Sequence, residues 1–264
     1  MIDQITPLVI TFDEAPNIAR LLSKLAWAHR IVVVDSGSTD ATLDILGQHP
    51  RVDVYNRQFD SAAGQCNFGL DQIPTEWVLS LDADYVLSDE LVAELSELDD
   101  EPEVSGYRAK FLYRIYGSKL RGALYPPRTV LHRTKAARYF DEGHTQRIAV
   151  PGIVRPLRGV IFHDDRKPLS RWFISQQRYC RLEAEHLLTT PVNRLSRSAR
   201  IRRMAAPAPI LVLLYVLFAK GCILDGWPGW LYALQRLLTE TMIALELVDR
   251  RLCQLAAPPN RPIA

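Results

Sequence analysis

Residues 5–81 alternate short apolar runs with amphipathic helical patterns, and this alternation limits the possible folds more than any other feature of the chain. The runs of strand length are Leu8–Ile10, Ile31–Val34, Val52–Tyr55 and Trp77–Leu81. The segment after the first run carries Pro16 in its first turn and has the spacing of a one-sided helix, with apolar residues at Ile18, Leu21, Leu22 and Leu25. Strands that alternate with helices predict a mostly parallel α/β sheet.

The middle and the end of the chain have different patterns. From Tyr107 to Ile115 the apolar residues fall on odd positions, which predicts a half-exposed strand. Residues 128–162 predict further strands and loops, and Ser170 is placed to cap a helix that runs to about Leu188. Ala205–Ala219 is uncharged, Gly226–Gly229 then interrupts the apolar stretch, and a helical pattern resumes over Trp230–Leu252.

Composition sets the outer limits. With 264 residues, a formal charge of +2, 23% charged residues and 48% hydrophobic residues, the chain is an ordinary globular protein without extensive disorder. No Walker A sequence and no GxGxxG is present, so the common phosphate-binding loops are excluded. The four cysteines form no CxxC pair, and the first residues do not resemble a signal peptide. We therefore expect reduced thiols and a cytoplasmic location.

Asp82-Ala83-Asp84 follows the apolar run Trp77–Leu81 directly. In extended backbone, residues i and i+2 point the same way, so both carboxylates can face one ligand. Hard oxygen donors suit Mg²⁺ or Mn²⁺, and a cation held there would neutralise a departing diphosphate. The alternative is a solvated turn after a strand, so the neighbouring motifs decide between the two interpretations.

Two more polar clusters follow apolar runs. Asp35-Ser36-Gly37-Ser38-Thr39-Asp40 comes after Ile31–Val34, and Thr11-Phe12-Asp13-Glu14 comes after Leu8–Ile10. The carboxyl ends of strands in an open α/β sheet border one ligand crevice, so we expect all three clusters at one edge. Asp35 is placed to accept hydrogen bonds from a base or ribose, whereas Asp40 can cap a short helix that contains Leu43 and Leu46. The alternative for these clusters is a set of turns and helix starts.

These three motifs, in this order, resemble those of the GT-A glycosyltransferases of family 2, especially the small bacterial enzymes that extend lipopolysaccharide core. The resemblance covers residues 5 to about 190 and differs at two positions, because Asp13 replaces the usual Asn and Tyr85 stands where Glu is frequent. It implies an α/β GT-A catalytic domain over 1–190, with a Rossmann-like nucleotide-binding part at about 1–100 and an acceptor subdomain at about 101–190. It also implies a divalent metal, inversion at the anomeric carbon, and a nucleotide site formed by Thr11, Asp13, Glu14, Asp35, Ser36 and Asp82.

An inverting transfer needs a general base that takes the proton of the acceptor hydroxyl. The family's base lies in the acceptor half, where Asp141-Glu142-Gly143-His144 is the best local match, and we favour Asp141 over Glu142. His163 is a candidate third metal ligand beside Asp82 and Asp84, and Arg166 and Lys167 are candidate partners of the diphosphate. The alternatives are a polar loop without a role and a structural histidine.

Residues 191–264 predict a basic linker followed by amphipathic, membrane-associated helices. Five arginines precede the apolar stretch, namely Arg194, Arg197, Arg200, Arg202 and Arg203. Ala205–Ala219 is shorter than the ~20 residues of a spanning helix, while Trp227, Trp230 and Tyr232 are residue types of membrane interfaces. We expect two interfacial or re-entrant helices, with the arginines on anionic lipid, at the cytoplasmic face of the inner membrane. The alternative is a pair of buried core helices.

Together these features predict a sugar transfer that depends on Mg²⁺ or Mn²⁺. The expected partners are a nucleoside-diphosphate sugar donor, a lipid-linked glycan acceptor such as lipopolysaccharide core, and the membrane surface, with no nucleic acid. A polyprenyl-phosphate glycosyl synthase is an enzymatic alternative, because its phosphate acceptor requires no strong base. A membrane-associated scaffold that keeps the fold without catalysis is an alternative from another class.

Overall fold

A computed structural model describes residues 1–142 and 145–256 of the chain. It contains two compact units, Met1–Lys167 and Pro168–Ala264. The units divide at Lys167, ahead of the helix that the sequence analysis assigned to a catalytic domain over 1–190. We describe each unit by itself.

The first unit is built on a mixed sheet with the order β3-β2-β1-β4-β8-β6-β11-β5. Its first part is parallel and consists of β1 (Ile5–Thr11), β2 (Ile31–Asp35), β3 (Val52–Asn56) and β4 (Trp77–Asp82). All four predicted strands are present, and each is slightly longer than its apolar run. The chain builds outward from β1 to β3 and then returns to place β4 on the other side of β1. This reversal of strand order is where open α/β sheets bind ligands.

The second part of the sheet is mixed. β8 (Arg128–Arg133) is antiparallel both to β4 and to β6 (Val104–Ile115), and β11 (Ile153–His163) runs parallel to β6. β5 (Tyr85–Leu87) pairs with β11, and the short β7 (Ser118–Lys119) pairs with β6. The strand predicted from Tyr107 to Ile115 is thus confirmed and starts earlier, at Val104. A separate hairpin joins β9 (Arg138–Glu142) to β10 (Thr145–Ala149).

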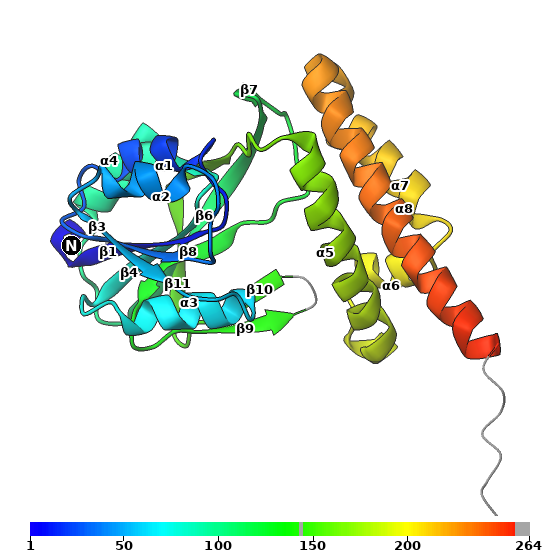
Figure 1. The fold of residues 1–264 in the computed structure, drawn as a ribbon, viewed down its shortest axis with the longest axis horizontal. Coiled ribbons are helices and arrows are strands. Elements are labelled where there is room, and N and C mark those ends of the chain that lie inside the picture. Colours follow the sequence, from blue (N-terminus) through cyan, green and yellow to red (C-terminus); the bar gives the residue numbers. More distant parts are fainter. Residues whose placement is uncertain (143–144, 257–264) are drawn as a thin grey trace, which may run out of the picture. The chain divides into compact units, whose positions relative to one another are not determined.

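Helices cover both faces of this sheet (Figure 1). α1 (Ile18–Lys24), α2 (Thr42–Gly47) and α4 (Asp89–Glu97) lie on one face, and α3 (Ala62–Asp71) lies on the other. A short 3₁₀ turn, η1 (Ile2–Gln4), precedes β1. The sequence analysis placed neither α3 nor α4. Both begin at a serine whose hydroxyl accepts a backbone N–H in the first turn, with Ser61 bonded to Gly64 and Ser88 to Leu91.

The second unit is helical. It consists of α5 (Leu169–Thr189), α6 (Arg197–Arg203), α7 (Ala208–Leu214), a π-helical continuation η3 (Tyr215–Ala219), and α8 (Gly226–Ala256), with short 3₁₀ turns η2 (Val192–Arg194) and η4 (Cys222–Asp225). Its core is formed by α5 and α8, where Leu187 and Leu247 are fully buried. Two predictions are corrected. The cap of α5 is Pro168 rather than Ser170, which lies inside the helix, and Gly226–Gly229 begins α8 instead of interrupting it.

Arg202 of α6 ties the helices of this unit together. Its guanidinium lies 2.9 Å from the Glu183 carboxylate of α5 and 2.8 Å from the Glu240 carboxylate of α8. The prediction that all five arginines face lipid is therefore wrong for Arg202, because two buried carboxylates hold it inside the bundle. Arg194 and Arg197 are exposed.

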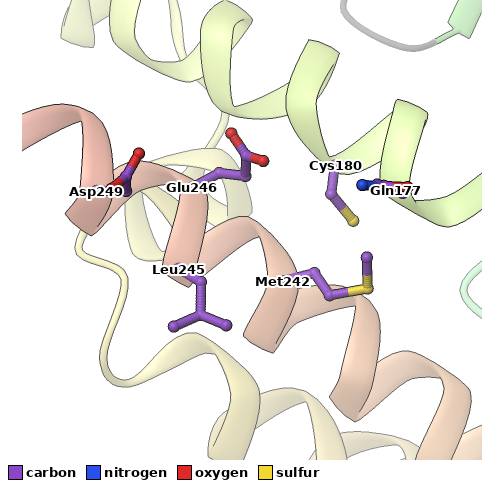
Figure 2. Close-up of a pocket in the computed structure, with 6 residues that line it drawn as sticks. All are labelled: Gln177, Cys180, Met242, Leu245, Glu246 and Asp249. Atoms are coloured by element: carbon purple, nitrogen blue, oxygen red, sulfur yellow. The ribbon is translucent and has the colours of Figure 1, made fainter.

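Among the described residues, no helix by itself has the length and apolar character to cross a bilayer, and one pair bent by 68°, Ala208–Ala219 with Cys222–Leu255, meets both criteria together. α5 and α8 also leave a shallow pocket of about 280 Å³ between them (Figure 2). Gln177 and Cys180 of α5 line it opposite Met242 and Glu246 of α8. None of these residues belongs to a predicted site.

Candidate active site

The three polar motifs lie at one edge of the sheet, since Thr11, Asp35 and Asp82 are the last residues of β1, β2 and β4. Asp35 is fully buried. Its Oδ1 accepts hydrogen bonds from the hydroxyls of Thr11 at 2.9 Å and Ser38 at 2.5 Å, and its Oδ2 accepts from the backbone N–H groups of Gly37 and Ser38. In this structure Asp35 therefore holds the loop after β2 in shape, and its contact with a nucleoside stays a prediction.

The loop after β1 is bonded to the loop after β2. Asp13 has a left-handed backbone with φ of 51°, which Asp and Asn tolerate better than most residues. Its Oδ1 accepts a hydrogen bond from the Thr39 N–H at 2.7 Å, and its own N–H donates to the Ser38 hydroxyl at 2.8 Å. The N-cap of α2 is Ala41 rather than the predicted Asp40, which lies one residue earlier and accepts from the N–H of Thr42, the first residue of α2, at 3.0 Å. The two loops form one hydrogen-bonded unit beside the ends of β1 and β2.

Asp84 and His163 meet at the same edge. The Nε2 of His163 lies 3.3 Å from the Oδ2 of Asp84. Burial, followed by the neighbouring carboxylate of Asp82, raises the pKa of Asp84 to about 8. Burial also lowers the pKa of His163, so its imidazole is neutral and has a lone pair available.

These residues fit a divalent cation by their chemistry. The Oδ1 of Asp84 and the Nδ1 of His163 are buried and, within the described residues, have no hydrogen-bond partner. A carboxylate oxygen in that state is costly unless a cation or a water satisfies it. No described group of three or more His, Cys, Asp or Glu residues is already arranged as a metal site. A Mg²⁺ or Mn²⁺ bound by Asp82, Asp84 and His163 would take its remaining ligands from water and substrate, and this set of ligands stays a prediction.

Aromatic side chains fix the orientation of His163. Its ring stacks on Tyr113 with centroids 4.5 Å apart, and Tyr125 and Tyr85 lie 5.1 and 5.6 Å away. The hydroxyls of Tyr85 and Tyr125 are hydrogen-bonded to each other. The imidazole is thus held on one side of Asp84 by a wall of rings from β5, β6 and the segment before β8.

Glu14 lies under this site and is paired with a predicted diphosphate ligand. The Lys167 ammonium is 2.5 Å from its Oε1, and the amide of Asn17 donates to its Oε2 at 2.8 Å. Burial, followed by the charge of Asp84, raises the pKa of Glu14 to about 7. The Asn17 amide also donates to Asp165 at 3.0 Å, so Asn17 joins the loop after β1 to the segment after β11.

Asp164 organises the other predicted diphosphate ligand. This carboxylate is buried, and its Oδ2 accepts from Arg20 at 2.9 Å and from Arg166 at 3.0 Å, while its Oδ1 accepts from the Gly117 N–H. The side-chain Oδ1 of Asn17 accepts from the Arg166 backbone N–H at 3.0 Å. Both predicted cations, Arg166 and Lys167, are therefore already paired with carboxylates.

The candidate bases lie on β9. Asp141 is exposed, and its Oδ1 accepts a hydrogen bond from the Ala63 N–H in the first turn of α3 at 3.1 Å. The Glu142 carboxylate instead accepts from Arg147 at 2.7 Å. Burial, followed by the charges of Asp82 and Asp141, raises the pKa of the Cys66 thiol. Asp141 and the Asp82 carboxylate of β4 therefore both lie near the Cys66 side chain. The neighbouring Gly143 and His144 lie outside the described residues.

A family model described as glycosyl transferase family 2 matches residues 8–163, which run from β1 to the end of β11. This chain belongs to glycosyl transferase family 2. As the match includes Thr11, Asp35, Asp82, Asp141 and His163, the predicted family is confirmed and the chain is a glycosyltransferase. The roles of the individual residues in this family 2 enzyme stay predictions.

Curated relatives of this family 2 enzyme are similar over different lengths. It is 26% identical over 269 residues to the lipopolysaccharide core biosynthesis glycosyltransferase LpsC of Rhizobium meliloti (strain 1021), a match that covers 97% of this chain and 95% of that protein. It is 30% identical over 113 residues to an uncharacterized glycosyltransferase of Rickettsia bellii (strain RML369-C), covering 41% of this chain. It spans only 38% of that relative's length, and 33% of a similar Rickettsia felis protein.

Solved structures also resemble this glycosyltransferase. Residues 1–349 of S. aureus TarS match with a TM-score of 0.46 and 16% identity, covering 95% of this chain and 91% of that one. Glucosyl-3-phosphoglycerate synthase from Mycobacterium tuberculosis, crystallised with Mn²⁺, UDP and glucosyl-3-phosphoglycerate, matches with the same score and 16% identity, covering 71% and 81%.

Sequence reasoning missed several polar residues of this family 2 site. Asn17, Arg20 and Asp164 connect α1 to the segment after β11, yet Asn17 and Arg20 look like ordinary polar residues of an amphipathic helix. Asn17 and Arg20 are three residues apart, which puts them on the same face of a helix. This spacing was the one sequence signal that could have linked them. Arg128, at the start of β8, was also missed.

Proposed function

We propose that this glycosyltransferase moves a sugar from a nucleoside-diphosphate donor to a lipid-linked glycan of the lipopolysaccharide-core type, with inversion at the anomeric carbon. The observation that carries the proposal is the buried, unpartnered Oδ1 of Asp84 beside His163 and Asp82 in a member of family 2. Similarity to LpsC over 97% of this chain supports a glycan acceptor.

In this proposal the donor lies along the carboxyl ends of β1, β2 and β4. The hydrogen-bonded loops that contain Thr11, Asp13, Glu14, Asp35 and Ser36 hold the nucleoside, together with Asp82. Arg166 and Lys167 offset the charge of the diphosphate. To do so, each gives up part of its present contact with a carboxylate and contacts a phosphate oxygen instead. A divalent cation held by Asp82, Asp84 and His163 supplies charge neutralisation of the leaving diphosphate when bound.

Asp141 is the proposed general base. Inversion requires a carboxylate that takes the proton of the acceptor hydroxyl while this hydroxyl attacks the anomeric carbon. Asp141 is exposed to an incoming acceptor, and its carboxylate is held in place by the Ala63 N–H in the first turn of α3. Glu142 is the weaker candidate because Arg147 pairs with its carboxylate.

The base is tested by comparing Asp141→Asn with Glu142→Gln. We expect the Asp141 change to lower turnover by about 100-fold or more, the usual scale for general-base removal, and to leave the Kd of the donor unchanged. Glu142→Gln is the matched control and keeps most activity. An active Asp141→Asn enzyme would remove this assignment.

The acceptor is tested with the full chain, Mn²⁺ and labelled donors carried by UDP, GDP or ADP. We expect label on a truncated core glycolipid and none on polyprenyl phosphate. Transfer to polyprenyl phosphate alone would establish the synthase alternative. If none of the donors is hydrolysed in a metal-dependent reaction, the result would favour the non-catalytic scaffold.

We also propose that the second unit binds the cytoplasmic face of the inner membrane. Large apolar side chains from α7 through the start of α8 are exposed, with Trp227 at 86% and Leu224 at 69%, and Ile210 and Phe218 each at 62%. Arg194 and Arg197 are exposed nearby in sequence and would contribute about 1 kcal/mol each on anionic lipid. A lipid-linked acceptor would then be presented at the surface where the enzyme resides.

Vesicle sedimentation tests this location. The double variant Phe218→Ser/Trp227→Ser should bind vesicles that contain anionic phospholipid at least tenfold more weakly. The two serines bury much less apolar surface in the membrane than phenylalanine and tryptophan do. Ile153→Ser, which changes an exposed apolar residue at the start of β11, is the matched control. Equal binding of both variants and the parent, or no binding of the parent at low salt, would refute the membrane proposal.

A further inference from the structure

Arg128 begins β8 at the edge of the sheet where the candidate site lies. β8 is antiparallel to β4, so the first residue of β8 lies at the end of the sheet where Asp82 ends β4. The pairing between β4 and β8 ends at Leu79 and Leu131. Arg128 therefore lies beyond this ladder, at the end of the sheet where the site lies.

A β-bulge turns the Arg128 side chain toward the site. β8 pairs with β6 at Leu131↔Tyr107, but one residue further along β6 the partner is Thr129, and Arg128 then pairs with Ala109. Val130 is the extra residue. With regular pairing, Thr129 would face Ala109, and Arg128 would face the exposed Lys110 on the opposite side of the sheet. The bulge therefore places Arg128 on the face of Ala109, which is fully buried.

The guanidinium of Arg128 lies among the aromatic residues that orient His163. It is 4.7 Å from the ring centroid of Tyr125, whose hydroxyl contacts Tyr85 and whose ring is 5.1 Å from His163. Burial acts to lower the pKa of Arg128, but the oxygens of Tyr125, Tyr85 and Asp82 raise it above its usual value, so the side chain remains a cation.

No carboxylate of the described residues lies within ion-pair distance of Arg128, whereas Arg166 and Lys167 have Asp164 and Glu14 at 3.0 and 2.5 Å. A half-buried guanidinium without a counter-ion is costly unless an anion reaches it. The planar group presents N–H donors in the geometry of a phosphate or carboxylate.

We propose that Arg128 is a substrate-binding residue that holds a phosphate or carboxylate group of a substrate at the mouth of the site. The inference rests on the proposed sugar transfer and deepens it, because it adds to the paired Arg166 and Lys167 a cation that has no carboxylate within ion-pair distance among the described residues. The bound anionic group belongs either to the donor diphosphate or to an acidic sugar of the acceptor.

Titration calorimetry on the full chain tests the proposal with two sets of probes. The first set is UDP, GDP and ADP with Mn²⁺, and the second is glucose 6-phosphate and glucuronate, with glucose as the uncharged reference. Arg128→Gln is compared with Arg108→Gln, which removes the same charge from the exposed side of the neighbouring strand. Thermal melts show that each variant is folded.

We expect Arg128→Gln to weaken at least one probe set by about 10- to 100-fold, the value of a charge-assisted hydrogen bond, and Arg108→Gln to change none by more than twofold. Loss with the nucleotides alone assigns the anion to the donor, and loss with the acidic sugars alone assigns it to the acceptor. Unchanged binding of every probe by Arg128→Gln overturns the proposal.

Two further outcomes separate this inference from the proposed function. If the parent enzyme binds no nucleoside diphosphate, the sugar transfer fails, while the acidic sugars still decide the role of Arg128. If Arg128→Gln does not fold, Arg128→Lys decides instead. Lysine keeps the charge and the contact with Tyr125 but not the planar donors, so a tenfold or greater loss of affinity supports the proposal and full affinity overturns it.

Discussion

Asp84 illustrates how a single residue in this enzyme is arranged for a ligand rather than for stability. Its Oδ1 is buried and has no hydrogen-bond partner among the described residues, and the charges of Asp82 and Asp165 lie nearby. A polar atom in that state costs about 1–3 kcal/mol of folding free energy. Sites that bind charged ligands often retain such costs.

Asp84→Asn should therefore separate activity from stability. We expect sugar transfer to fall by at least about 100-fold, because a neutral amide is a poor cation ligand, and the free energy of unfolding to rise by about 1 kcal/mol, because the folded chain no longer buries a carboxyl group whose pKa burial raises. Urea unfolding in the presence of a chelator, beside the transfer assay, measures both. A variant that keeps its activity or becomes less stable would contradict this account of Asp84.

Asn17 is expected to behave in the opposite way. Its buried amide joins Glu14, Asp165, Arg20 and the Arg166 N–H, so Asn17→Ala leaves several buried polar groups without a partner. We expect unfolding to become easier by about 2–3 kcal/mol and transfer to weaken as Lys167 and Arg166 lose their alignment. Ser23→Ala, on the exposed side of the same helix, is the control in the same urea titration and should change stability by less than about 0.5 kcal/mol.

At this scale the sequence predicted which residues meet but not which neighbours they use. Asp84 and His163 were assigned to one site, and the structure places them 3.3 Å apart. That Asp35 would be enclosed by Thr11, Gly37 and Ser38 depends on the fold of two loops, which apolar periodicity does not specify. Long-range polar partners such as Asn17 and Asp165 are separated by most of the catalytic unit in sequence and carry no local signal.

Among the elements, α6 depends on one ion pair cluster. Arg202→Ala would leave Glu183 and Glu240 buried without their cation, and we expect a loss of about 3–5 kcal/mol in the stability of the helical unit. Arg197→Ala, five residues earlier on the same helix and exposed, should lose less than about 0.5 kcal/mol. Thermal unfolding followed by circular dichroism distinguishes them. Similar melting of the two variants would show that the cluster does not stabilise the bundle.

The parallel strands were predictable from their apolar residues, whereas α3 was not, because close packing selects small residues there. The four parallel strands follow from their apolar runs. α3 contains Gly64 and Gly69 and lacks a clear apolar face, and a Cβ at Gly69 would lie 2.3 Å from Leu8 of β1. The helix is therefore defined by its approach to the sheet, which only the three-dimensional structure reveals.

For the whole molecule, the family match and the first compact unit end within a few residues of each other, at His163 and Lys167. The sequence analysis extended the catalytic domain to about 190 because it followed the resemblance through the next helix. In the structure that helix, α5, packs in the second unit, whose core it shares with α8.

The acid sensitivity of the catalytic unit should depend on His132. This side chain is fully buried against Tyr139, and burial lowers its pKa to about 4. Between pH 6.5 and 4 the unfolded chain binds a proton at His132 and the folded chain does not, so stability falls as the pH falls, by up to about 3 kcal/mol. The buried carboxyl groups of Glu14 and Asp84, with pKa values raised to about 7 and about 8, contribute the opposite slope over most of this range, so the difference from a variant is the relevant quantity.

Urea titrations from pH 4 to pH 7.5 measure that difference. His132→Gln should be free of the loss below pH 6.5, whereas His49→Gln, at an exposed position, should retain it. Parallel pH profiles for His132→Gln and the parent would show that other groups govern acid unfolding.

The extra residue Val130 also gives the enzyme latitude to change its substrate. Upstream of it, β8 presents Arg128 to the site, while downstream Leu131 and His132 are fixed in the interior. The bulge separates the inward–outward alternation of side chains before Val130 from that after it. Replacements at the Arg128 end of β8 therefore do not shift the residues that form the core. Side chains at this one strand end can therefore be exchanged without a compensating change in the rest of the sheet.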